Sequence, residues 1–246
     1  MPHPALADLA HRPWPVPARP WALTMRWEDL LFLHWRVPAA RLRAHLPPGL
    51  ELETFDGAAW LGVVPFRMAA TRWRWLPPVP GTHAFPELNV RTYVRANGRP
   101  GVWFFSLDAT SVLAVAGARC TFGLPYFRAR IGCGRAGAWH GYHSERTDRR
   151  GPPALFAAEW REVGPRTVAR PGSLEHFLVE RYCLWVARRG RLLVGDVAHL
   201  PWQLAPVELR LLGCEMTRGL GFATFGPPDS ALAAAPLTVA AWSPRP

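Results

Sequence analysis

Residues 87–111, ELNVRTYVRANGRPGVWFFSLDATS, decide the fold class of this chain. Polar and apolar side chains alternate on both sides of Asn97-Gly98, which is typical of strands with two unlike faces. Asn-Gly favours a two-residue hairpin loop, because both central positions of such a loop need a positive φ. The stretch therefore predicts an antiparallel β-hairpin and a mainly β fold.

The position of the turn also predicts the register of the hairpin. A two-residue turn at Asn97-Gly98 places Glu87 opposite Asp108 and Asn89 opposite Ser106. One face of the hairpin is then apolar, and the other carries a polar row: Glu87, Asn89, Arg91, Ser106 and Asp108. A four-residue loop would keep these faces in a shifted register, whereas a loop of three or five residues would turn one strand over.

The polar row has two interpretations. It faces water, as one side of an antiparallel sheet often does, or it lines a cavity. Glu87 and Asp108 facing each other would repel when both are ionised, unless a cation or a shared proton intervenes, and Arg91 is the nearest cation. Tyr93 and Phe104 also occur in the row, and pockets combine apolar walls with a few polar groups. We favour the cavity.

Length and composition predict one globular domain. The chain has 246 residues, of which 49% are hydrophobic and 19% charged, which suits a folded protein with a substantial core. We expect a Pro-rich lead-in at residues 1–22, the domain at 23–226 and a C-terminal tail at 227–246. No apolar run is long enough for a transmembrane helix, and the Pro-rich start lacks a secretory h-region, so we expect a cytoplasmic protein without a membrane partner.

Other segments predict further elements around the hairpin. The expected features are a strand at Trp27–Val37, a turn at Asp56-Gly57, strand-like sequence over 112–134 with a bend at 123–125, a helix beginning after Ser173, and a hairpin at Arg189-Gly190. His34 lies in the apolar strand, so we expect a core histidine. Glu180 and Arg181 are expected to form a surface or structural ion pair.

The basic residues do not predict a nucleic-acid partner. All 29 basic residues are arginine, and the net charge is +11. The arginines are spread along the chain rather than clustered, which indicates a GC-rich genome more than a binding surface. The alternating residues Arg72 to Trp75 are a candidate contact between copies of the chain, so the sequence leaves open whether the protein forms a homo-oligomer.

The sequence predicts no metal and no cofactor. None of its four cysteines forms a C-x-x-C pair, so we expect free thiols. Cys133, His140 and His143 could share a metal, but no further ligand completes that set. The fingerprints G-x-S-x-G, H-E-x-x-H and G-x-G-x-x-G and the P-loop are all absent, which disfavours serine hydrolases, zincins, dinucleotide-binding folds and P-loop proteins.

A series of motifs in fixed order resembles a known family. The motifs are LFLHWRVP, FDGAAWLGVVPFRM, FPELNVRTYVR, GVWFFSLDA, FGLPYF, YHSER, GSLEHFLVERYCLW and HLPW. From about residue 24 to 210, the chain closely resembles the YqjF-like family of uncharacterised conserved proteins, domain-of-unknown-function family 2071. The resemblance implies an architecture similar to acetoacetate decarboxylase: an antiparallel β-barrel or curled sheet around a small cavity, with a few peripheral helices.

The resemblance also implies a difference in chemistry. Acetoacetate decarboxylase forms a Schiff base through a lysine just after a Gly-x-Pro bend. Here the matching bend, Gly123-Leu124-Pro125, is followed by Tyr126, and the chain contains no lysine. The amino group of Met1 is the remaining amine, and its Pro-rich surroundings give no reason to place it in a cavity. Glu87 lies on the strand that is similar to the one bearing an acidic site residue in the decarboxylase.

Together these observations predict a cavity that binds a small organic acid or ketone without Schiff-base chemistry. We expect Glu87, Asp108 and Tyr126 to be the residues that move protons or stabilise charge. The expected ligand-binding residues are Asn89, Arg91, Ser106 and Arg119. Two alternatives remain: a lysine-independent lyase or hydrolase acting on a small organic acid, and a structural or interaction protein with a filled, inert barrel.

Overall fold

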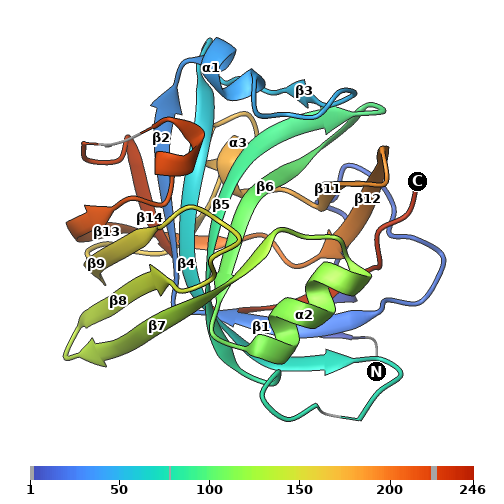
Figure 1. Ribbon diagram of the computed structural model, residues 1–246, viewed down its shortest axis with the longest axis horizontal. Helices are drawn as coiled ribbons and strands as arrows, with labels where there is room; N and C mark the ends of the chain where they lie inside the picture. The colour runs from blue at the N-terminus through green and yellow to red at the C-terminus, as the bar shows by residue number, and fades with distance from the viewer. Residues whose placement is uncertain (1–2, 78, 223–225) are drawn as a thin grey trace.

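The computed structural model describes residues 3–77, 79–222 and 226–246. These residues form a single curled sheet of 15 strands with three short α-helices. The central strands are β4 (Ala59–Trp73), β5 (Phe85–Ala96) and β6 (Arg99–Ala109). They run through the middle of the molecule, with β7 to β9 on one side and β11 and β12 on the other (Figure 1). The predicted mainly β fold with a curled sheet and peripheral helices is confirmed.

The strand pairings close into two rings that share β4, β5 and β6. The first, which we call the cavity ring, is completed by four strands: β1 (Leu23–Glu28), β15 (Leu237–Ala241), β12 (Arg191–Ala198) and β11 (Cys183–Arg188). Strand β1 closes this ring because one of its edges pairs with β15 and the other with β4. Strand β11 closes the other side by pairing in parallel with β6.

The second ring, the packed ring, continues from the opposite end of β6. Its further strands are β7 (Tyr126–Ala136), β8 (Trp139–Arg146), β9 (Leu155–Glu162), β13 (Gln203–Cys214), β14 (Ser230–Ala234) and β2 (Leu30–Val37). Two short strands pair at the margins: β3 (Glu51–Leu52) with β5, and β10 (Thr167–Val168) with β13. The pairing of β2 with β4 completes the ring.

The helices are short and lie outside the sheet. They are α1 (Ala39–Arg43), α2 (Val112–Thr121) and α3 (Leu174–Val179), with 3-10 turns η1 (Pro4–Leu6) and η2 (Arg218–Leu220). Within the described residues, no helix is long and apolar enough to cross a membrane.

Alternation along the shared strands gives each ring its own core. On β5, Leu88 and Val90 face the packed ring and join a cluster with Phe156 and Trp160 of β9. The intervening side chains face the cavity ring, because successive residues of a strand point to opposite sides. Phe66 of β4, which pairs with Glu87, belongs to the apolar cluster of the cavity ring. One strand therefore contributes to both interiors.

The central hairpin has the predicted turn but not the whole predicted register. Asn97 and Gly98 both have positive φ, 49° and 73°, and the pairing runs as predicted as far as Arg91 opposite Phe104. There a β-bulge leaves Phe105 as an extra residue, and Val90 then pairs with Ser106. Beyond the bulge, the side chains of β6 change sides.

Because of this bulge, the prediction of the polar row is wrong for its members on β6, Ser106 and Asp108. Glu87 lies opposite Ala109, and Asp108 lies opposite Leu88. Glu87 and Asp108 therefore project from opposite faces of the sheet and do not form the expected facing pair of carboxylates. Ser106 moves with Asp108 to the side of the packed ring.

Several flanking predictions are confirmed and others are wrong. The turns at Asp56-Gly57 and Arg189-Gly190 are present. The predicted strand at Trp27–Val37 is two strands, separated at Asp29, whose φ is 51°. Residues 112–121 form α2 rather than a strand, because the Ser111 side chain caps the helix by accepting from the Ala114 amide at 3.2 Å and alanine favours helix.

The ends of the chain belong to the sheet more fully than the sequence suggested. The expected tail at 227–246 supplies β14 and β15. The lead-in packs against this end, where the Trp242 indole donates to the carbonyl oxygen of Arg19 at 2.7 Å. Residue 226 is therefore not the end of the folded region.

The parallel contact between β6 and β11 depends on the absence of a side chain at Gly101. A Cβ atom there would lie 2.7 Å from the Cys183 sulfur and 2.8 Å from the Cys183 carbonyl oxygen. We expect Gly101→Ala to lower the free energy of unfolding by about 2 kcal/mol, since the backbone must move to relieve the overlap. Urea denaturation measures this change.

The matched control is Gly134→Ala on β7, where a Cβ atom would have no neighbour within 4 Å. We expect it to unfold within about 0.5 kcal/mol of the wild type. Equal stability of the two variants would contradict the close approach at Gly101.

Candidate functional site

The cavity ring encloses a cavity of about 470 Å³. Most of the lining side chains are aliphatic or aromatic, among them Phe32, Phe66 and Trp202. Apart from threonines, the lining also includes a small set of side chains with an ionisable or hydrogen-bonding group. They are Trp27, Glu87, Asn89, Arg91, Tyr126, Arg181, Cys183, His199 and Trp202. Such a combination is typical of small-molecule sites.

Glu87 is a buried carboxyl group in this lining. Its exposed fraction is 2%, and its Oε2 atom accepts a hydrogen bond from the Tyr126 hydroxyl at 2.9 Å. Burial raises the pKa of Glu87 to about 8, although hydrogen bonds from Tyr126 and Asn89 oppose the shift. The group is therefore mainly protonated at neutral pH, and it can donate a hydrogen bond.

The bend after α2 positions Tyr126. Gly123 has a φ of 70°, and the chain then enters β7, where Tyr126 pairs with Leu107 of β6. Arg119, in the last turn of α2, donates to the Tyr126 carbonyl oxygen at 2.8 Å. Burial, together with the neighbouring Glu87, raises the pKa of Tyr126 well above its ordinary value, so the phenol stays protonated and donates.

Arg91 brings a positive charge into the cavity. Its guanidinium donates to the Leu178 carbonyl oxygen at 3.0 Å and lies 5.1 Å from the ring centre of Phe32. Its Nε atom is buried without a hydrogen-bond partner. Among the described residues, no carboxylate forms an ion pair with Arg91. A cation in this position attracts an anionic ligand.

Asn89 lies between Glu87 and Arg91 on the cavity face of β5. Its exposed fraction is 8%, and its Oδ1 atom has no hydrogen-bond partner among the described residues. A buried acceptor without a donor lowers stability unless water or a ligand supplies the donor. Asn89 therefore marks the middle of the polar row as a place for a donor group.

A second layer of side chains surrounds Arg91. Tyr93 lies one position further along this face, and its hydroxyl is 2.6 Å from His34 Nε2. Burial and the charge of Arg91 lower the pKa of His34 well below its ordinary value, so this histidine is neutral. Gly62 permits the close packing, since a Cβ atom there would lie 3.1 Å from His34 and 3.3 Å from Arg91.

The structure places three predicted site residues away from the cavity. Asp108 is fully buried on the packed-ring side, where Arg146 donates to both of its oxygen atoms at 2.7 Å and 2.9 Å. Ser106 is buried on the same side. Arg119 contacts the backbone of Tyr126 and does not line the cavity. The geometry brings together only Glu87, Asn89, Arg91 and Tyr126.

Sequence reasoning missed two polar residues of the cavity. Arg181, expected in a surface or structural pair with Glu180, is 8% exposed and instead pairs with Glu53. His199 is buried, with its ring centre 5.3 Å from that of Trp202, and burial lowers its pKa. The HLPW motif contains both His199 and Trp202 and was the available signal for this wall.

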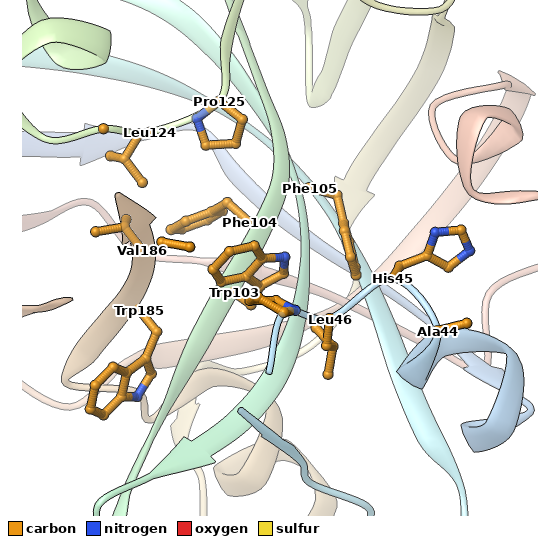
Figure 2. Close-up of a pocket in the computed structure, with 13 residues that line it drawn as sticks. Ala44, His45, Leu46, Trp103, Phe104, Phe105, Leu124, Pro125, Trp185 and Val186 are labelled. Carbon is orange, nitrogen blue, oxygen red and sulfur yellow. The ribbon is translucent and has the colours of Figure 1, made fainter. Parts of the chain in front are cut away.

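A second pocket lies on the outer surface, where β6 changes partners. One edge of β6 pairs with β11 at Val102 and Trp103 and then with β7 from Leu107 onward. A groove of about 570 Å³ lies between these two contacts. Figure 2 shows Phe104 between Leu124 and Val186 in this groove. Phe104 and Leu124 also line the cavity, so they form the partition between groove and cavity.

The groove is not the better candidate site. Its lining is mainly aromatic and aliphatic, and His45 is its one titratable side chain among the described residues. The described part of the chain also contains no group of three or more His, Cys, Asp and Glu side chains placed to hold a metal ion. The cavity, with its row of polar groups, is the candidate site.

Solved structures define the class of this fold. The enduracididine biosynthesis enzyme MppR with bound HEPES buffer matches with a TM-score of 0.63 and 16% identity, over 92% of this chain and 88% of that chain. An acetoacetate decarboxylase from Legionella pneumophila subsp. pneumophila strain Philadelphia 1 matches with a TM-score of 0.60 and 13% identity, over 99% and 95% of the two chains. The fold is that of the acetoacetate decarboxylase class.

The chain itself belongs to domain-of-unknown-function family 2071, a family of uncharacterised conserved proteins, whose sequence model matches residues 24–240. It is 43% identical to the uncharacterised protein YqjF of Bacillus subtilis (strain 168) over 196 residues, which are 80% of each chain. The predicted resemblance is confirmed.

The buried pair of Asp108 and Arg146 has a structural role, which a substitution tests. The two side chains are 0% and 3% exposed. Arg146→Leu leaves a buried carboxylate without a partner, so we expect the free energy of unfolding to fall by roughly 4 kcal/mol.

The control is Arg130→Leu, which removes an ion pair whose side chains are 71% and 53% exposed. We expect a loss below about 1 kcal/mol. Chemical denaturation of both variants measures the difference, and similar losses would show that Asp108 does not depend on Arg146.

The raised pKa of Glu87 predicts a pH dependence of stability. The native state keeps this proton up to about pH 8, whereas the ordinary pKa of a glutamate carboxyl group, which the unfolded chain retains, is 4.5. The contribution of Glu87 to stability is therefore fully present below pH 4.5 and is lost as the pH rises from 4.5 to about 8. Between these two pH values, we expect the free energy of unfolding to fall by up to about 1 kcal/mol per pH unit.

Glu87→Gln keeps the hydrogen-bonding shape and removes the titration. We expect its free energy of unfolding, measured by urea denaturation across the same window, to fall less steeply with pH than that of the wild type. The exposed Glu145→Gln is the control and should follow the wild type. Parallel curves for the wild type and Glu87→Gln would rule out the raised pKa.

Proposed function

We propose that this protein binds a small organic acid or ketone in the cavity, without forming a Schiff base. The observation that supports this most directly is Arg91. Its guanidinium lines the cavity, its buried Nε atom has no partner, and no carboxylate of the described residues pairs with it. A ligand carboxylate would supply both the missing charge and the missing acceptor.

The rest of the polar row suits an oxygen-bearing ligand. Protonated Glu87 donates a hydrogen bond, so a carbonyl or hydroxyl oxygen is a suitable partner for it. The free Oδ1 atom of Asn89 accepts one, so a ligand hydroxyl or a bound water is suitable there. Hydroxy and oxo acids carry these groups together with a carboxylate.

The absence of lysine supports binding without an imine. No lysine amine is present to attack a carbonyl carbon. The residue after the Gly-Leu-Pro bend is Tyr126, and its hydroxyl donates to Glu87. Met1, the source of the remaining amine, lies outside the described residues.

The size of the cavity disfavours the alternative of a filled, inert barrel. About 470 Å³ falls within the range of roughly 300–1,000 Å³ that is usual for small-molecule sites. The unpartnered atoms of Asn89 and Arg91 would also lower the stability of a structure that never binds anything. The structure of MppR complexed with pyruvate suggests a first probe of suitable chemistry.

Proton transfer is the second candidate function. A carboxyl group with a pKa near 8 can both release and take up a proton at neutral pH, as general acids and bases do. In this alternative, Arg91 holds the substrate carboxylate, and Glu87 exchanges a proton with the substrate carbon or oxygen. A lyase or hydrolase that needs no lysine could use this step.

A thermal-shift experiment tests the proposed function. We expect pyruvate to raise the Tm of the wild type in proportion to the logarithm of its concentration, by roughly 5–10 °C at a hundred times Kd. Arg91→Met removes the charge at nearly constant volume and should abolish the shift. Glu87→Gln keeps a donor and should reduce the shift only in part.

The control is Arg130→Leu, which removes an exposed arginine outside the cavity lining and should respond like the wild type. If no acid or ketone shifts the Tm of the wild type, and Arg91→Met and Glu87→Gln both melt well below it, the polar row is a structural network and the proposed function is wrong.

A further inference from the structure

The polar and apolar parts of the cavity occupy different positions along its length. From this we infer that the ligand is a carboxylic acid with an apolar tail, bound with its carboxylate at the inner end, beside Arg91, and its tail toward an opening beside α2. The inference rests on the proposed function, because it specifies the class of acid that the same site takes.

The inner end lies at Arg91 and is closed by α3. The guanidinium donates to the carbonyl oxygen of Leu178 in that helix. Tyr93 follows on the same face of β5, and its ring centre is 5.2 Å from that of Phe177 in α3. His34 packs behind Tyr93 and is fully buried. The positive charge therefore lies against α3 and the Tyr93 side chain, and Arg91 itself is half-buried.

The outer end lies between α2 and the segment that connects β4 to β5. Three of the described lining residues are exposed: Leu76 in the connecting segment, and Leu113 and Thr121 of α2. Leu76 is 53% exposed and Leu113 is 58% exposed. In Figure 1, α2 lies at the end of the molecule where β5 begins. An opening edged by leucine favours an apolar group over a charged one.

The polar row connects these two ends. Arg91 lies four residues further into β5 than Glu87, which corresponds to roughly 13 Å of extended strand. Asn89 and Glu87 thus lie between the inner cation and the opening. A ligand whose carboxylate is at Arg91 and whose tail points to Leu113 must pass both groups, so a hydroxyl or oxo group near the carboxylate can bond to them.

The volume of the cavity also favours a ligand larger than pyruvate. At about 30 Å³ per molecule in liquid water, 470 Å³ corresponds to roughly fifteen water molecules. A three-carbon acid would leave most of this space unfilled, against walls made of side chains such as Phe66, Met68 and Trp73. An aliphatic or aryl tail would cover those walls and release the water.

A chain-length series provides the test. We would measure Kd by calorimetry at neutral pH for the straight-chain acids from butanoate to dodecanoate. Burying one methylene contributes about 0.8 kcal/mol, so we expect Kd to fall about fourfold per added carbon. The gain should stop once the tail reaches solvent at the opening. Arg91→Met should weaken every member of the series by tenfold or more.

A variant of the opening separates the tail from the carboxylate. Leu113→Asp places a charge where the tail would lie, so we expect weaker binding of the long acids and unchanged binding of butanoate. The matched control is Leu212→Asp on β13. This leucine is also exposed, at 67%, and is not part of the cavity lining, so its variant should bind the whole series like the wild type.

The possible results are distinguishable. A steep dependence on chain length that is lost in Leu113→Asp, with Arg91 required throughout, supports the inference. Binding that needs Arg91 but does not change with chain length would overturn it and leave the proposed function of a small-acid site intact. Chain-length dependence without any effect of Arg91→Met would overturn the assigned orientation. No binding of any acid would overturn both proposals.

Discussion

The three strands shared by the two rings are the constraint on which the site depends. Side chains of a strand alternate between two faces. Here one face of β4, β5 and β6 lines the interior of the cavity ring, and the other lines the interior of the packed ring. On the packed-ring side, Leu88 and Val90 meet a dense apolar cluster. The residues that alternate with them along β5 therefore face the other interior, and they are Glu87, Asn89 and Arg91. The polar lining of the cavity follows from strand periodicity.

Burial then determines the charge of each group in this lining. Glu87 lies among apolar side chains and has no cation as a hydrogen-bond partner, so it holds its proton. Arg91 adds a guanidinium that lacks a partner of opposite sign among the described residues. One wall of the cavity thus presents a neutral donor and a cation separated by the amide of Asn89. Such a wall is complementary to an anion that also carries a neutral oxygen.

Sequence reasoning could predict those parts of the site that depend on local pattern. The turn at Asn97-Gly98 and the cavity-facing positions of β5 follow from alternation and turn chemistry. The bulge at Phe105 interrupts this alternation and could not be predicted from it; beyond the bulge, Asp108 meets a buried partner on another strand, Arg146. One extra residue in β6 therefore changed the side to which half of the predicted row belongs.

Two further errors have origins of their own. Residues 112–121 contain valine and leucine in a short run that periodicity cannot assign to strand or helix. The cap by Ser111 and the need to cross from β6 to the parallel strand β7 give a helix instead. Arg181 follows a short helix, and nothing in that local sequence indicates its burial. Its buried ion pair is with Glu53, which is distant in the sequence. The pairing of Arg181 thus depends on a residue far away in the chain, whereas the cap at Ser111 is local.

The closure of the cavity ring by β15 has a consequence for biosynthesis. Strand β1 begins at Leu23, and its partner on one side is a strand that ends at Ala241. Pairings of such wide sequence separation form slowly and leave edges exposed in the meantime. Nascent chains of this protein therefore expose one edge of β1 until β15 has been synthesised.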